Sequence, residues 1–165
     1  YPPYLGAGIR VLQMAPDLRA IRIRMGLGWY NRNYVGTQFG GSLYSMTDPF
    51  FMLMIMENLG RDYIVWDKAA HIDFVAPGKG PVFADFHIDE TLLSDIRSHT
   101  AQGETYLPEL KVDVRDAASG IRKAAASGSD HRGRRHGWQR PGSGAGAQRP
   151  EYSDRRRRPA EHQAV

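Results

Sequence analysis

The sequence contains no cysteine, and this absence excludes several kinds of chemistry. Without thiols the chain can form no disulfide framework, no thiolate metal site and no cysteine nucleophile. A lack of disulfides is typical of a reducing compartment, so we expect a cytoplasmic protein. The sequence opens without a basic segment followed by an apolar run, so we also expect no signal peptide.

Long apolar runs are also missing. The longest, residues 50–56, is far shorter than the roughly 20 residues that cross a bilayer as a helix. We therefore expect a soluble chain with no membrane partner. Its 165 residues are enough for one domain with a sizeable core.

Large apolar residues are nearly absent from the end of the chain. Between residues 118 and 165 the only Val, Ile, Leu, Met or Phe residues are Ile121 and Val165. Such a segment cannot bury enough apolar surface to offset the entropy lost on ordering it. We therefore expect a folded domain at residues 1–117 and a basic, low-complexity tail at residues 118–165.

Three origins of this tail are compatible with the sequence. These origins are an out-of-frame reading of a GC-rich gene, a native disordered segment, and a basic arm that binds an acidic surface such as RNA or DNA. Residues 1–115 hold 11 Lys and Arg against 13 Asp and Glu, whereas residues 116–165 hold 11 against 5. Because the excess positive charge lies in the tail, the net charge of +4 does not describe the domain, and we expect no nucleic-acid partner.

Alternating apolar and polar residues predict several strands with one buried face. The predicted strands are residues 18–27, 63–75, 82–88 and 107–115. The turn residues 76–80 predict that the second and third of these strands form a hairpin. A short helix is predicted at residues 91–100, with Thr91 as its N-cap.

The longest predicted helix spans residues 43–58, with Ser42 as its N-cap and Gly60 as its stop. Its second half is apolar on every side, and such a helix must be buried on every side. Pro49 should kink the helix, because it removes one backbone hydrogen bond. In a small domain this indicates an α+β fold in which a bent antiparallel sheet packs around one central helix.

Residues 33–48 resemble the signature of hotdog-fold thioesterases of the phenylacetate-pathway type. In that family an Asn is followed, after five residues, by His-Gly-Gly, and an Asp lies on the helix seven residues after the second Gly. This sequence has Asn33, Gly40, Gly41 and Asp48 at those spacings, with Phe39 in place of the His. The likeness covers residues 15–116 and is also found in a branch of unknown function that carries Phe-Gly-Gly.

The resemblance implies a hotdog fold and hydrolysis of acyl-CoA or a similar thioester by a homodimer or tetramer whose sites lie across the interface. Coenzyme A would arrive as part of the substrate, so we expect no separate cofactor. Asp48 would be the general base or nucleophile, and Asn33 would bind the water or shape the loop. The amides of Gly40 and Gly41 would stabilise the negative charge that develops on the carbonyl oxygen.

Each of these residues also has a structural interpretation. Asp48 could make only local polar contacts, the two glycines could only permit tight packing of the helix on the sheet, and Asn33 could be a turn residue. Thr37, Gln38 and Phe39 could line the substrate site in place of the missing His.

Because the motif His is absent, a non-catalytic module that binds acyl-CoA is the alternative function. Several other residues are of metal-binding types, but they are spread over two strand faces without compact spacing, so we expect no metal site. These residues are Asp67, His71, Asp73, Asp85 and His87.

Overall fold

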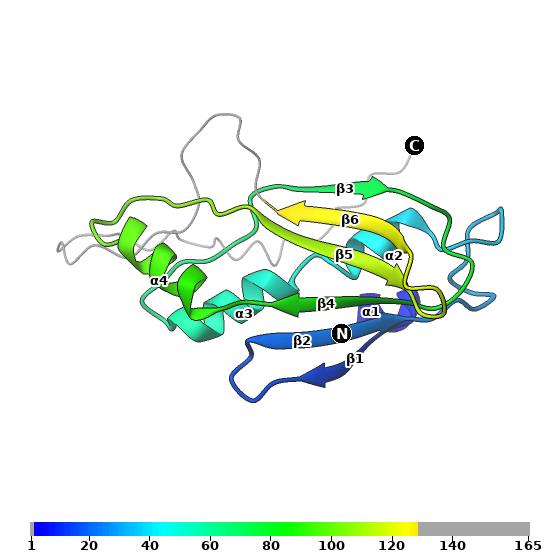
Figure 1. Ribbon diagram of the computed structural model, residues 1–165, viewed down its shortest axis with the longest axis horizontal. Coiled ribbons are helices and arrows are strands. Elements are labelled where there is room, and N and C mark those ends of the chain that lie inside the picture. Colours follow the sequence, from blue (N-terminus) through cyan, green and yellow to red (C-terminus); the bar gives the residue numbers. More distant parts are fainter. Residues whose placement is uncertain (1, 129–165) are drawn as a thin grey trace, which may run out of the picture.

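Six antiparallel strands form one sheet in the computed structural model, which describes residues 2–128. The strands are β1 (Ile9–Met14), β2 (Ala20–Met25), β3 (Ala70–Phe74), β4 (Val82–His87), β5 (Leu110–Asp116) and β6 (Arg122–Gly128). Their order across the sheet is β1-β2-β4-β5-β6-β3. β1 and β3 are therefore the two edge strands, and they lie at the bottom and top of Figure 1.

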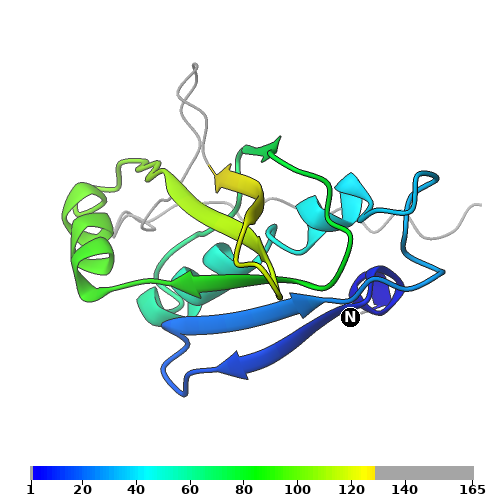
Figure 2. The ribbon, with the colours of Figure 1, turned by 45° about the vertical axis from the view of Figure 1, so that its right-hand side comes forward.

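The helices are α1 (Pro2–Ala7), α2 (Gly40–Ser45), α3 (Phe50–Leu59) and α4 (Glu90–His99). α2 and α3 lie against one face of the sheet, and the sheet curves around that side, as the two views in Figures 1 and 2 show. The core forms between α3 and the inward side chains of the strands. None of the helices in the described part of the chain has the length and apolarity that a membrane span requires.

The predicted α+β hotdog architecture is confirmed, but the central helix consists of two pieces. α2 ends at Ser45, α3 begins at Phe50, and residues 46–49 between them are not helical. Pro49 accounts for the break, because proline lacks an N–H donor and disfavours a helical conformation of the residue before it. The break therefore places Asp48 at a junction rather than inside a helix.

The ends of the central helix differ partly from the prediction. Ser42 is not the N-cap; the helix begins at Gly40, and Phe39 occupies the cap position without a side-chain hydrogen bond. Gly60 ends α3 as predicted, with a φ of 84° that favours glycine.

The apolar half of the central helix is buried on most of its surface. Phe50, Met54 and Ile55 are buried, and Phe50 packs against Phe86 of β4 with ring centroids 5.0 Å apart. Leu53, however, is 40% exposed. The predicted burial on every side is therefore incomplete within a single chain.

The alternation in β2, β4 and β5 correctly predicted which side chains face the core. Buried positions in these strands are Ile21, Ile23, Met25, Val82, Ala84, Phe86, Val112 and Val114. The helix after β4 was also predicted, but its N-cap is Asp89, whose carboxylate accepts a hydrogen bond from the Leu92 amide at 2.8 Å. Thr91 is therefore not the cap.

The predicted hairpin between residues 63–75 and 82–88 is wrong. β3 pairs with β6 at the edge of the sheet, whereas β4 lies between β2 and β5. The turn residues 76–80 do reverse the chain, but they carry it from the sheet edge to its centre. Alternation indicates which faces a strand presents and not which strand lies beside it.

The predicted domain boundary at residue 117 lies too early. β6 pairs with both β3 and β5, and its Ala124 and Ala126 are buried in the core. Alanine fills these inward positions, so a search for large apolar residues does not detect the strand. The rest of the predicted tail, residues 129–165, lies outside the described residues.

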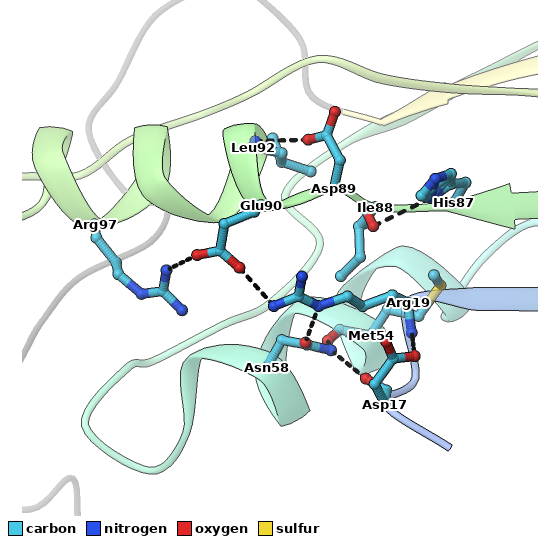
Figure 3. A network of polar contacts seen from close by, with 10 residues as sticks. All are labelled: Asp17, Arg19, Met54, Asn58, His87, Ile88, Asp89, Glu90, Leu92 and Arg97. Carbon is cyan, nitrogen blue, oxygen red and sulfur yellow. Dashed lines mark hydrogen bonds and ion pairs between the residues drawn. The ribbon is translucent and has the colours of Figure 1, made fainter. Parts of the chain in front are cut away.

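Polar contacts join the connection between β1 and β2 to the ends of α3 and α4 (Figure 3). Arg19 donates hydrogen bonds to Asn58 Oδ1 at 3.1 Å and to Glu90 Oε2 at 2.5 Å, and Arg97 donates to Glu90 Oε1 at 2.7 Å. Arg97 and Arg19 hold the pKa of Glu90 below its usual value. These groups lie at the surface, so their ion pairs stabilise the fold only slightly, and no predicted site residue takes part in them.

Candidate functional site

Asn33 organises the loop that precedes α2. Its side-chain amide donates hydrogen bonds to Thr37 Oγ1 at 2.8 Å and to the Gln38 carbonyl oxygen at 3.3 Å. Its Oδ1 accepts hydrogen bonds from the amides of Val35 and Thr37 at 3.1 and 2.9 Å. Such side-chain to backbone bonds are typical of an Asx turn, so the contacts support the structural interpretation of Asn33.

Gln38 fastens the same loop to the sheet. Its side chain is 4% exposed, and Nε2 donates hydrogen bonds to the carbonyl oxygens of Gly26 and Gly80 at 3.2 and 3.0 Å. These two glycines follow β2 and precede β4, so one side chain holds the loop against the middle of the sheet. The position of the start of α2 therefore depends on Gln38.

Gly40 and Gly41 form the first turn of α2, where an α-helix leaves its N–H groups without intrahelical partners. A Cβ atom on Gly40 would lie 3.0 Å from the ring of Phe74 in β3, and one on Gly41 would lie 2.5 Å from the ring of Phe39. The missing side chain of Gly40 therefore allows α2 to pack closely against β3. This contact supports the packing interpretation of Gly40 beside the proposed role of its amide.

Asp48 lies apart from this loop, in a pocket at the junction of α2 and α3. Four parts of the chain surround the pocket: the junction, the segment before β3, the segment from residue 107 to 112, and the end of β6. The lining residues are Tyr44, Thr47, Asp48, Phe51, Trp66, Asp67, Lys68, Ala69, Ala70, Leu107, Pro108, Leu110, Val112, Ala126, Ser127 and Gly128.

The pocket is small. Its volume is about 40 Å³, whereas pockets that enclose small-molecule ligands usually measure roughly 300–1,000 Å³. A space of this size holds about two or three water molecules. The described part of a single chain therefore offers Asp48 a place for water but no enclosed place for an acyl chain.

Asp67 is a residue of this pocket that the sequence did not reveal as part of a site. Asp67 as a whole residue is exposed, but partial desolvation of its carboxyl group and, to a smaller extent, the Asp48 carboxylate raise its pKa to about 6. Both causes disfavour the charged form of a carboxyl group. The pocket thus combines two interacting carboxyl groups with a space for water.

The alternation of residues 63–75 placed Asp67 on the solvent face of a strand. In the structure β3 begins only at Ala70, and both Trp66 and Asp67 line the pocket from the preceding segment. The sequence holds no signal that separates Asp67 from the other acidic residues of that pattern, and none that identifies Asp48 as its neighbour.

The predicted site residues therefore fall into two groups. One group forms the loop and the first turn of α2, and the other consists of Asp48 at the far end of α2. The first group contains Asn33, Thr37, Gln38, Phe39, Gly40 and Gly41, none of which lines the pocket around Asp48.

Within residues 2–128, no three His, Asp or Glu side chains are grouped so that they could hold a metal ion. His71 and Asp73 of β3 do meet, with Nε2 and Oδ1 3.0 Å apart, and both side chains are exposed. This pair lies at the sheet edge and not in the pocket.

Residues 1–126 match a protein-family model described as a domain of unknown function (DUF4442). No curated protein matches the chain. Among solved structures, a protein of unknown function from Pseudomonas aeruginosa, described as a probable thioesterase, aligns with a TM-score of 0.69 and 16% identity over 78% of this chain and 84% of its own.

Two further structures share the fold. A thioesterase from Haemophilus influenzae aligns with a TM-score of 0.57 and 14% identity over 76% of this chain and 78% of its own. The E. coli PaaI protein of the phenylacetic acid degradation operon aligns with a TM-score of 0.56 and 17% identity over 86% of both chains. At these identities the likeness shows a common fold, and the resemblance to hotdog thioesterases is confirmed at that level.

Proposed function

The chain belongs to the DUF4442 family, and we propose that it hydrolyses the thioester bond of an acyl-CoA or a similar substrate. The observation that carries this proposal is the pocket in which Asp48 adjoins a space for water and a second carboxyl group. The shared fold with proteins described as thioesterases supports it.

In the proposed reaction Asp48 acts as the general base. Its carboxylate takes a proton from a water molecule in the pocket, and the water attacks the thioester carbonyl carbon. The amides of Gly40 and Gly41 stabilise the negative charge on the carbonyl oxygen. Asn33 and Gln38 hold the loop that positions these amides, because their side chains bond to it or to the adjoining sheet.

The proposed site also contains Thr37 and Phe39. Thr37 lies in the same hydrogen-bonded loop as Asn33. Phe39, which is 55% exposed at the start of α2, provides an apolar surface for the acyl chain outside the small pocket. This arrangement uses the aromatic side chain that replaces the motif His and gives it a role in binding rather than in proton transfer.

A second copy of the chain is needed to complete this site. The two glycines and Asp48 lie at opposite ends of α2, and a helix of this length spans about 9 Å. The base and the amide donors must both come within about 3 Å of the reacting atoms. We therefore propose a homodimer in which Asp48 of one copy and the glycines of the other meet at one carbonyl.

The edge strand β3 is the proposed contact between the two copies. Among residues 2–128 it pairs with β6 on one side only, and an unpaired strand edge can bind another strand. Phe74 and Val75 at its end are 58% and 52% exposed. Pairing of two copies along β3 would continue the sheet and cover apolar side chains near this edge.

Phe74→Asp is expected to weaken this dimer by more than about 100-fold, because it moves a charge into an apolar contact. The matched control is Leu12→Asp on β1, the opposite edge strand, where Leu12 is 48% exposed. Sedimentation at several protein concentrations measures the dissociation of the dimer in both variants. Equal dissociation of the two variants, or a native protein that is monomeric at high concentration, would rule out the contact at β3.

A panel of acyl-CoA substrates tests the proposed activity. The panel includes short aliphatic, long aliphatic and aromatic acyl groups, and the release of free thiol is measured with the full-length chain. We expect turnover of at least one member. If no thiol is released but an acyl-CoA raises the melting temperature, the chain is the non-catalytic binding module instead, a function favoured by the absence of the motif His.

A further inference from the structure

We propose that Asp67 is a second catalytic residue, which donates a proton to the leaving sulfur atom while Asp48 accepts one from the attacking water. This inference rests on the proposed thioester hydrolysis. It assigns a role to a residue outside the motif that the sequence shares with hotdog thioesterases.

The geometry of the pocket brings the two carboxyl groups together from separate elements. Asp48 enters from the junction of α2 and α3, and Asp67 enters from the segment before β3. Both line one space of about 40 Å³. A few water molecules fill a space of that size, so a bound water can contact both groups.

The surroundings favour the protonated form of Asp67. Phe51, Trp66 and Leu107 contribute apolar surface to the pocket, and burial together with the charge of Asp48 raises the pKa of Asp67. Two carboxyl groups that share a site in this way divide the roles of acid and base, because they resist being charged together.

The other titratable groups around the pocket are few. Tyr44 comes from α2, and Lys68 follows Asp67 in the chain. The residues that line the pocket from β6 and from the segment 107–112 are uncharged. Asp48 is therefore the neighbouring carboxylate whose charge contributes to the raised pKa of Asp67.

The chemical steps balance without any further reactant. Water forms a bond from its oxygen to the thioester carbon, and its proton passes to the Asp48 carboxylate. The carbon–sulfur bond then breaks, and the proton of Asp67 passes to the sulfur. The products are a carboxylic acid and a free thiol, and the proton on Asp48 returns through solvent to Asp67.

Removal of the Asp67 carboxyl group should leave the fold intact. Its pKa is higher in the folded chain than its usual value of 3.8, so the folded state holds this proton more tightly than the unfolded state. The resulting contribution to stability is lost as the pH rises from about 4 to about 6. At neutral pH the charged Asp67 opposes folding, and Asp67→Asn removes that opposition.

The experiment measures kcat/KM between pH 5 and pH 8 with the best substrate of the acyl-CoA panel. Because the acid must be protonated, the native protein should lose activity above about pH 6. At pH 5.5, Asp67→Asn should be about 100-fold less active than the native protein. This value is at the lower end of the usual contribution of a general acid, because a thiolate leaves readily even without a proton. The difference should shrink towards pH 8, where native Asp67 is largely charged. Asp62→Asn, an exposed carboxylate in the same connection, should match the native protein.

A second measurement does not depend on activity. Carbon NMR of labelled aspartate side chains follows the titration of Asp67 in the native chain and in Asp48→Asn. We expect the pKa of Asp67 to fall in the variant, because the neighbouring negative charge is gone, and to stay above its usual value because burial remains.

The outcomes separate the two proposals. A native protein that hydrolyses no thioester overturns the proposed function and, with it, the catalytic role of Asp67. In an active protein, a pH profile that Asp67→Asn does not change overturns the role of Asp67 alone. An Asp67 titration that Asp48→Asn leaves unaltered overturns the pairing of the two groups.

Discussion

A chain that ends at residue 117 is expected to aggregate, whereas a chain that ends at residue 128 is expected to fold. The shorter chain lacks β6, which pairs with β5 on one side and β3 on the other. Each ladder hydrogen bond contributes roughly 1 kcal/mol. The loss of two ladders is therefore comparable with the roughly 5–15 kcal/mol that stabilises a whole domain.

The chain that ends at residue 117 would also lose residues of the core and of the pocket. Ala124 and Ala126 leave the core, and β5 gains an open edge that can bind other chains. Ser127 and Gly128 leave one side of the pocket around Asp48. Soluble yield, circular dichroism and thermal melting of the two truncated chains provide the comparison. A cooperative melting transition of the chain ending at residue 117 would contradict the role given to β6.

The extent of the fold also limits which residues can belong to the tail. β6 and the family match both lie before residue 129. The three origins considered for the tail therefore concern residues 129–165, which lie outside the described residues. Resequencing of the gene across the codons that follow residue 126 tests whether the reading frame changes there.

Periodicity revealed those parts of the fold in which large apolar side chains alternate. In β2, the residues Ile21, Ile23 and Met25 face the core, and Arg22 and Arg24 between them point outward. Such a pattern arises directly from burial of one face of the strand, so it can be recognised in the amino-acid sequence alone. The apolar half of the central helix was found for the same reason.

The strands that the sequence did not reveal bury little or bury only small side chains. In β1 only Ile9 is buried, and the register shifts between Val11 and Gln13. In β6 the inward residues are the alanines Ala124 and Ala126. The neighbour of β3 was also missed, because strand pairing depends on contacts between distant segments and not on the pattern within one strand.

The motif located part of the candidate site, and three-dimensional packing revealed the rest. The spacing from Asn33 to Asp48 marked the loop, the first turn of α2 and the junction. Asp67 belongs to no such spacing, since it reaches the pocket from the segment before β3. Only the fold shows that Asp48 and Asp67 interact and that the glycines lie at the other end of α2.

Asp48→Asn is expected to lower kcat/KM about 100- to 10,000-fold, the usual contribution of a general base. An amide retains the shape and the hydrogen-bonding capacity of the carboxylate but does not accept the proton of water. This loss corresponds to roughly 3–5 kcal/mol of transition-state stabilisation. Substrate binding should change far less, because Asp48 acts on the water rather than on the acyl group.

The control for this prediction is Glu57→Gln. Glu57 is an exposed carboxylate on α3 that does not line the pocket, so its loss should leave kcat/KM within about two-fold of the native value. Both variants should melt close to the native temperature, since exposed substitutions usually change stability by less than about 0.5 kcal/mol. Thiol release that is equally slow in the native protein and in Asp48→Asn would show that the water is activated by another group. Because Asp67 is the other carboxyl group that adjoins the same space, the pH profile of the native protein would then assign its role: activity lost below about pH 6 would make Asp67 the base, and activity lost above about pH 6 would make it the acid.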